Sequence, residues 1–229
     1  LTPGMLIELY GSGLGPVEGV LSRVGSNNRL ETITADTRVL FDEVPSPLLF
    51  VRNDQVNAIV PYEVSNRRTV RVVVSSAGHR SFPLTFEVAQ AEPGIFAYPG
   101  ISQGKILNQD NTINTATNGA EPDSIIQLYA TGEGIHEAAT QYADGAITGA
   151  LLSRPRLPVT ARIDGVQTEV LYAGSAPGLV AGVMQVNLRV PPGVRRAAQV
   201  PVQISVGGIT SAAGVTVATG KPCMASPGP

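Results

Sequence analysis

The chain has 229 residues, enough for one large or two ordinary domains, and 16 basic residues nearly balance 18 acidic ones, giving a net charge of −2. This balance gives no electrostatic reason to expect a nucleic acid or an anionic membrane as a partner. No apolar run approaches the roughly 18 residues that a membrane helix needs, so no membrane span is expected.

The first predicted strand belongs to a sequence repeat. Residues 6–15 read LIELYGSGLG, and residues 125–134 read IIQLYATGEG. The segment QVNAIVP at 55–61 likewise returns as QVNLRVP at 185–191. The two copies therefore stay aligned over a unit of roughly 120 residues. A unit of this length is large enough to bury its own core. We expect two domains that are copies of one unit.

Apolar residues alternate with other residues along several segments. The alternation runs through residues 7–10 and 70–74 in the first copy, and through 126–129 and 200–206 in the second. A period of two indicates half-buried strands, and no helical spacing is sustained anywhere. Gly (25 residues) and Pro (18 residues) punctuate the apolar runs, as they do in antiparallel sandwiches. The predicted fold is all-β: two tandem immunoglobulin-like antiparallel β-sandwich domains from an internal duplication.

Two-residue turns are predicted at matching places in the two copies. Asp164-Gly165 stands between two short apolar runs, which is a strong hairpin signal, and it aligns with Asp42-Glu43. The segment Ala77-Gly78-His79-Arg80 is a second expected hairpin turn, and it matches residues 207–210. We therefore expect the same strand pairing in both copies.

The repeat sets the expected domain boundaries. The first sandwich should cover residues 1–91 and the second residues 100–219, joined by a Pro-Gly linker at 92–99 and followed by a Pro/Gly-rich tail at 220–229. Because the chain starts at Leu1 without an initiator Met or a signal-like segment, we expect a processed product or an excised part of something longer.

The two copies differ most in their loops and in the tail. The segment 174–182 is largely missing from the first copy, and the stretch 135–158 connects strands with little periodicity. The lone Cys223 cannot form an internal disulfide, which leaves an inert thiol or an intermolecular attachment point. Long loops on a rigid sandwich often carry binding. The predicted interaction surface therefore comprises Tyr129, Ser175, Pro177, Leu179, Asp110, Asn111 and Cys223.

The segment Asn108–Asn114 carries side-chain oxygens at alternate positions, as a calcium loop does. It lacks the glycine at the sixth position and the bidentate glutamate at the twelfth, and further ligands would have to come from Glu121 or Asp123. A hairpin that turns at Asp110-Asn111 is the simpler interpretation.

Other candidate chemistries are weak. The glycine-rich segment 11–15 is predicted to be a turn rather than a phosphate loop, because no helical period follows it. The two histidines, His79 and His136, stand at non-equivalent positions and do not suggest a zinc site. Tyr10 and Tyr129 are equivalent residues that point away from the expected core, where they would cover the sandwich rim or stack on a ligand.

The pair Gln55 with Asn57 recurs as Gln185 with Asn187, where a strand ends in Val-Pro. An identical polar pair in both copies is more typical of a structural device than of two ligand sites. We expect its amides to bond the backbone of a neighbouring loop.

Several motifs in order resemble one family. These are YGSGLG at 10–15, the paired QVN segments, PGIF at 93–96 and ILNQD at 106–110. Together they resemble the Solibacter-type C-terminal domain found in large secreted proteins of acidobacteria, over roughly residues 3–218. That family has no established activity, so the resemblance implies export and a non-catalytic accessory role. The chain departs from the family at Asp110-Asn111, where Asp-Gly is usual, and its tail lies outside the resemblance.

The resulting functional expectation is a non-catalytic secreted, cell-surface or periplasmic module for attachment or assembly within a larger protein or complex. Open sheet edges would bind a protein partner or a second copy. Association with a membrane complex as an accessory subunit stays open. The alternative is a module for a glycan or another extracellular ligand, using the loop 174–182 and Tyr129. No catalytic residue, cofactor or metal ligand is assigned.

Overall fold

The computed structural model describes residues 1–137 and 143–220, and apart from the 3-10 helix η1 (Tyr62–Asn66) its regular elements in these ranges are strands. No helix in these ranges is long and apolar enough to cross a membrane. Contacts divide the chain into two compact units, and we consider each by itself. Unit 1 comprises Leu1–Glu92, Thr131–Leu157 and Gly174–Met184, and unit 2 comprises Pro93–Ala130, Pro158–Ala173 and the chain from Gln185 onward.

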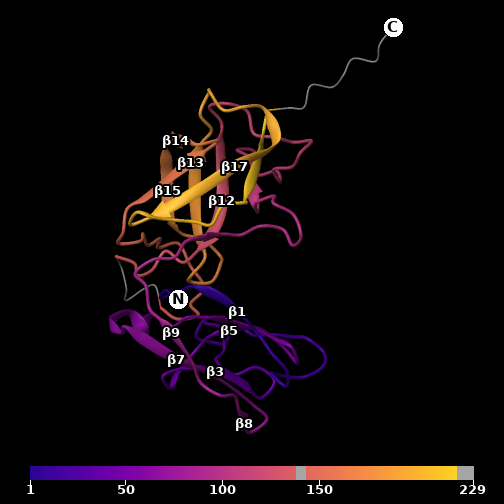
Figure 1. The fold of residues 1–229 in the computed structure, drawn as a ribbon, viewed down its shortest axis with the longest axis vertical. Coiled ribbons are helices and arrows are strands. Elements are labelled where there is room, and N and C mark those ends of the chain that lie inside the picture. The colour runs from indigo at the N-terminus through magenta and orange to yellow at the C-terminus, as the bar shows by residue number, and fades with distance from the viewer. Residues whose placement is uncertain (138–142, 221–229) are drawn as a thin grey trace. The chain divides into compact units, whose positions relative to one another are not determined.

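Unit 1 contains two antiparallel sheets (Figure 1). One sheet has the strand order β1-β6-β5-β2, and the other has the order β4-β3-β7-β8 with β9 also paired to β7. The strands are β1 (Leu6–Tyr10), β2 (Val20–Leu21), β3 (Thr37–Phe41), β4 (Val44–Pro45), β5 (Leu48–Arg52), β6 (Gln55–Ile59), β7 (Thr69–Ser76), β8 (His79–Arg80) and β9 (Leu84–Glu87).

The inner faces of these sheets form one hydrophobic core. In β7 the side chains of Val70, Val72 and Val74 are buried, whereas Arg71 between them is exposed, as the alternation predicted. Buried residues of β3, β5 and β6 complete the cluster, and Leu9 and Phe86 pack against it. Hydrophobic burial of alternate positions therefore holds the two sheets together.

Unit 2 repeats the second sheet of unit 1 and three strands of the first, because β12-β16-β15 matches β1-β6-β5 and β14-β13-β17-β18 matches β4-β3-β7-β8. Its sheets have the orders β10-β12-β16-β15, with β11 also paired to β12, and β14-β13-β17-β18, with β19 also paired to β17. The prediction of an all-β chain with two duplicated immunoglobulin-like sandwiches is confirmed. The strands are β10 (Gly94–Ile95), β11 (Ile106–Leu107), β12 (Ile125–Thr131), β13 (Val159–Ile163), β14 (Val166–Thr168), β15 (Val170–Ser175), β16 (Met184–Arg189), β17 (Ala197–Val206), β18 (Ile209–Thr210) and β19 (Thr216–Thr219).

The two-residue hairpins form where the sequence predicted them. Phe41 pairs with Val44 across Asp42-Glu43, and Ile163 pairs with Val166 across Asp164-Gly165. All four turn residues have positive φ, between 47° and 75°, as the turn that matches strand twist requires. The turns at Ala77-Gly78 and Gly207-Gly208 form in the same way.

The expected linker does not run free between the sandwiches. Gly94–Ile95 is strand β10, next to β12 in the first sheet of unit 2, and the N–H of Phe96 donates to the carbonyl oxygen of Tyr129 at 2.9 Å. The sequence-based domain boundaries stay a prediction. The contacts add that two segments of the second half, 131–157 and 174–184, cluster with the first half.

Candidate functional site

The hairpin at Asn108–Asn114 satisfies the Asp110 carboxyl with its own donors. The N–H and the hydroxyl of Thr112 both donate to Asp110, at 3.0 and 2.6 Å, and these bonds lower the pKa of the Asp110 carboxyl. Asn111 has a φ of 63° at the turn. The hairpin interpretation is confirmed. No group of three metal-binding side chains occurs in residues 1–137 and 143–220.

The second predicted loop is part of a ribbon in unit 1. The N–H of Thr148 donates to Leu179 O, and the N–H of Ala181 donates to Ala146 O, both at 2.8 Å. Ser175 lies in the interior rather than at the surface, because its hydroxyl accepts the N–H of Ser153 at 2.9 Å.

Of the other four residues of the predicted surface, three lie in the described part of the chain. Pro177 and Leu179 are exposed, at the turn of the ribbon. Tyr129 is half-buried in β12 of unit 2. Cys223 lies outside the described residues.

The repeated amide pairs bond each other. Gln55 Nε2 donates to Asn57 Oδ1 at 2.8 Å, and Gln185 Nε2 donates to Asn187 Oδ1 at 2.9 Å. The expected bond to the backbone of a neighbouring loop is wrong, because residues two apart on a strand share a face and lie within reach of each other.

Sequence reasoning missed a buried contact between a carboxyl group and an imidazole. Glu133 and His136, each 1% exposed, lie with Oε1 and Nε2 3.1 Å apart in the segment that follows β12. His136 had been considered only as an isolated histidine. Its i,i+3 partner lies within the glycine-rich repeat, where Glu133 has no acidic counterpart in the first copy, and that difference was the available signal.

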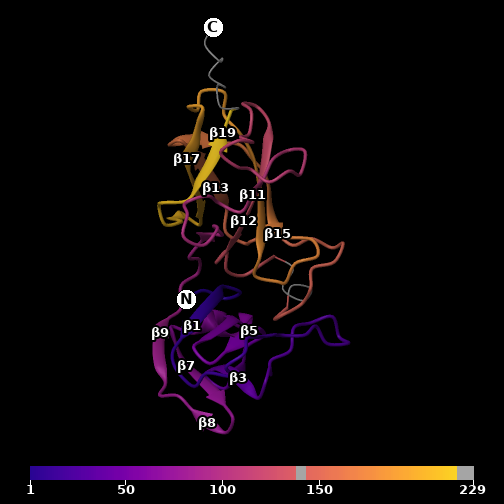
Figure 2. The ribbon, with the colours of Figure 1, turned by 90° about the vertical axis from the view of Figure 1, so that its right-hand side faces the viewer.

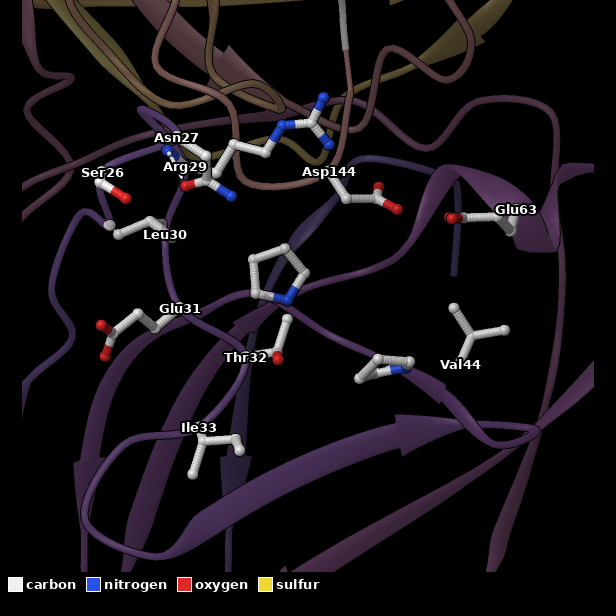
Figure 3. Close-up of a pocket in the computed structure, with 13 residues that line it drawn as sticks. Ser26, Asn27, Arg29, Leu30, Glu31, Thr32, Ile33, Val44, Glu63 and Asp144 are labelled. Atoms are coloured by element: carbon white, nitrogen blue, oxygen red, sulfur yellow. Dashed lines mark hydrogen bonds between the residues drawn. The ribbon is translucent and has the colours of Figure 1, made fainter.

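A cavity of about 900 Å³ lies in unit 1 (Figure 3). Its walls come from the loop 25–33, from β4 and from two carboxylates, Glu63 of η1 and Asp144. Figure 3 shows these carboxyl groups pointing toward each other. Asp144 Oδ1 also accepts the N–H of Tyr62 at 2.8 Å.

The two carboxyls of this cavity titrate as a pair. Burial and the hydrogen bond with Glu63 raise the pKa of Asp144 to about 7. The same hydrogen bond lowers the pKa of Glu63. Burial is the larger cause of the raised pKa of Asp144, and a proton shared with the Glu63 carboxyl adds to it. This pair fastens residue 144 to η1.

The edge of β9 offers unpaired backbone groups. Just after β9, the N–H of Val88 donates to the carbonyl oxygen of Arg68, which precedes β7. Bonding alternates along an antiparallel pair, so Thr85 and Glu87 direct their backbone groups away from β7. Leu1 N donates to Glu87 O at 3.0 Å. Thr85 N–H, Thr85 C=O and Glu87 N–H have no hydrogen-bond partner within residues 1–137 and 143–220.

Apolar side chains are exposed beside this edge. Phe82 is 92% exposed and Leu84 is 59% exposed. Figure 2 shows β9 at the margin of its unit, with β7 on its inner side. An edge strand with free N–H and C=O groups is a template for another strand, and natural proteins usually block it.

The equivalent edge of β19 in unit 2 is fully covered. Thr216 matches Thr85, because it pairs with Pro201 where Thr85 pairs with Arg71. Thr216 N–H donates to Ser102 O at 2.7 Å, and Thr216 O accepts the N–H of Gly104 at 2.9 Å. Among the described residues, the β19 edge is therefore covered at a place where the equivalent β9 edge is not.

A buried amide closes the rest of the β19 edge. Asn114 is 0% exposed, and its Oδ1 accepts the N–H of Ala218 at 2.8 Å while its Nδ2 donates to Ala218 O at 2.9 Å. All four residues of β19 are buried, whereas three of the four residues of β9 are exposed.

Comparisons with known proteins give only distant likenesses. No family model matches the chain, and no curated protein matches it. Among solved structures, the extracellular region of plexin A4 is 11% identical with a TM-score of 0.29, and the alignment covers 96% of this chain and 17% of that one. The titin Ig tandem A164–A165 is 11% identical with a TM-score of 0.27, over 96% and 91% of the two chains.

A glycosyl hydrolase family 2 member from Bacteroides cellulosilyticus DSM 14838 is 13% identical with a TM-score of 0.25, over 79% of this chain and 22% of that one. Likenesses at these TM-scores carry no argument about function. The chain spans less than a quarter of the plexin and hydrolase chains. None of these comparisons bears on the resemblance to the Solibacter-type domain, which stays a prediction.

Proposed function

We propose that the chain is a non-catalytic attachment module that binds an extended polypeptide by strand addition at the edge of β9. The observation that carries this proposal is the row of outward backbone groups at Thr85 and Glu87, beside the exposed Phe82 and Leu84. Backbone hydrogen bonds supply affinity in strand addition, and neighbouring side chains supply specificity.

The setting of this activity follows the family resemblance. A Solibacter-type domain would lie in a secreted or surface protein, where a module of this kind holds larger parts together. The pair Glu63 and Asp144 is assigned a structural role in this proposal, because it joins η1 to the segment 131–157 within unit 1. The contact between Glu133 and His136 is assigned a structural role because both residues are buried.

The test is a selection from a displayed peptide library on the immobilised chain, with Thr85→Pro as the counter-target. Proline at residue 85 removes an outward N–H that β7 does not use, and proline is tolerated in edge strands, so the variant should fold. Thr85→Val keeps the N–H and serves as the matched control.

The proposal expects peptides that bind the wild type and Thr85→Val but lose about tenfold or more in affinity for Thr85→Pro. Matching circular dichroism and melting of the three proteins would establish that binding alone has changed. A selection in which every peptide binds Thr85→Pro as tightly as the wild type would contradict the proposal.

A further inference from the structure

The cavity of unit 1 has walls that long-range contacts hold in place. The N–H of Leu30 donates to Gly145 O at 2.8 Å, so the loop 25–33 is joined to the segment that carries Asp144. Gly145 also packs closely against the cavity wall, because an added Cβ would lie 2.9 Å from Pro47 Cβ. A hollow of about 900 Å³ with such walls has the size of a pocket for a small organic group.

The charged groups of this cavity favour a cation. Glu63 and Asp144 meet at one side of it, and Figure 3 shows the Glu31 carboxylate at the opposite side. Among the described residues that line the cavity, Arg29 is the single basic one. Its charge lowers the pKa of Glu63 and opposes the rise in the pKa of Asp144. Three carboxyl groups therefore share the cavity with one guanidinium group.

The carboxyl pair is the place where a cation gains most. Burial and the hydrogen bond with Glu63 raise the pKa of Asp144 to about 7, because two ionised carboxylates repel each other at this partly buried place. At low pH one shared proton removes that repulsion. A cation between the two carboxylates removes it as well, and each carboxylate then accepts a charge-assisted hydrogen bond.

We propose that this cavity binds a primary ammonium group on an aliphatic stem. The ammonium lies between Glu63 and Asp144, and the stem lies along the buried Pro47. An ammonium group has three N–H donors, and a long amine packs its carbon chain on apolar surface while its charged head stays at a polar site. A calcium ion takes about six to eight oxygen ligands, more than two carboxyls supply.

This site goes beyond the proposed strand addition, because it shares no residue with the edge of β9. It is also compatible with the structural role of the carboxyl pair. The bound ammonium donates to both carboxylates, so it keeps η1 joined to residue 144 as the shared proton does.

Binding displaces the shared proton, so the affinity depends on pH. Below about pH 7 the ammonium competes with this proton, and above it the pair is free. The other charged groups that face Asp144 are Arg29 and Glu31, from the loop 25–33, and Glu63, from η1. We expect the affinity to rise about fivefold or more from pH 6 to pH 8, where aliphatic amines are still charged.

The experiment titrates the full chain with n-pentylamine and, in a second arm, with a short peptide that holds one internal lysine. The readout is the backbone amide NMR signals of Tyr62 and Gly145. We expect saturable shifts at pH 8, and the tighter of the two probes identifies a free amine or a lysine side chain as the source. Pentan-1-ol and the same peptide with acetylated lysine are the matched neutral probes, and neither should shift these signals.

Three variants separate the site from general electrostatic attraction. Asp144→Asn still accepts the N–H of Tyr62, and it should lose about tenfold or more in affinity together with the pH dependence. Glu18→Gln removes one charge at an exposed position outside the cavity and should bind as the wild type does. Arg29→Gln removes a competing positive charge and should bind about twofold more tightly or better, a gain that misfolding does not produce.

The inference is overturned by no saturable shift at tens of millimolar amine and pH 8. Wild-type affinity in Asp144→Asn, equal shifts with the neutral probes, or an affinity that falls from pH 6 to pH 8 would overturn it too. Calcium chloride is titrated in parallel, and saturable shifts with calcium but with neither amine would show a divalent-cation site instead. None of these results involves Thr85, so the proposed function stands or falls separately.

Discussion

Asp144 and Glu63 hold one proton between two carboxyl groups at the wall of the cavity. The pKa of Asp144 is raised from 3.8 to about 7, so between these pH values the folded chain keeps a proton that the unfolded chain has lost. Stability contributed by this proton is complete below about pH 4 and is lost as the pH rises to about 7.

Asp144→Asn should therefore remove this pH dependence. The asparagine oxygen still accepts the N–H of Tyr62, and its amide donates to Glu63 as the protonated carboxyl does. We expect wild-type stability near pH 4 and a gain of about 1 kcal/mol at pH 8, after allowing for solvent screening of a partly exposed group.

Urea unfolding of both proteins from pH 4 to pH 8.5 measures this difference. Asp110→Asn is the control, because its carboxyl is exposed and its pKa is lowered rather than raised. A constant difference between Asp144→Asn and the wild type across this range would contradict the shared proton.

At the scale of elements, the repeated hairpins depend on residues with positive φ. Gly165 has a φ of 75°, and an added Cβ would meet nothing within 4 Å. Gly193 also has open space around it, but its φ is not positive. Comparing substitutions at these two glycines therefore separates the effect of backbone conformation from the effect of packing.

Gly165→Ala should lower the free energy of unfolding by about 1 kcal/mol, because alanine is strained in the left-handed region. Gly193→Ala should be neutral or stabilising by about 0.5 kcal/mol, because alanine restricts the unfolded chain. Denaturant melts of the two variants check this. Equal effects at both positions would show that the sign of φ does not decide the cost.

Local patterns predicted the elements of this fold well. Alternation identified the buried faces of Val70 and Val202, and the Asp-Gly dipeptide at 164 identified its turn, because both signals lie within a few residues. Local patterns did not predict the open edge at Thr85. Whether such an edge is covered depends on whether a distant segment, such as Ser102–Gly104 in unit 2, lies beside it.

The cavity was missed for the same reason. Tyr62 and Asp144 are 82 residues apart in sequence, and no local pattern joins them. The segments that carry Asp144 and Ser175 were expected to form binding loops. Instead the segment with Asp144 bonds to Leu30 and Tyr62 of the first half, and the segment with Ser175 bonds to residues 146–153.

At the scale of the whole molecule, unit 1 is assembled from three separate stretches of chain. The N–H of Leu6 donates to Thr131 Oγ1 at 2.9 Å, and the N–H of Leu30 donates to Gly145 O at 2.8 Å. A fragment of residues 1–92 lacks both acceptors, although it contains every strand of the first sandwich.

We expect this fragment to unfold at a lower urea concentration than the first sandwich does within the full chain. Each lost hydrogen bond costs about 1 kcal/mol, and newly exposed apolar surface adds to the loss. Hydrogen exchange in the folded fragment should accelerate at Leu6 and Leu30, with Val56 as the internal control. Equal protection in fragment and full chain would show that these segments do not support unit 1.

The position of Leu1 has a practical consequence. Leu1 forms backbone hydrogen bonds with both Glu87 and Ala89, so any polypeptide joined to its amine starts beside the open edge. A short flexible extension is presented to Thr85 at an effective concentration in the millimolar range, before any partner arrives in solution. An amino-terminal affinity tag would therefore act as an intramolecular competitor, and a tag at the opposite terminus is the safer design for every binding measurement.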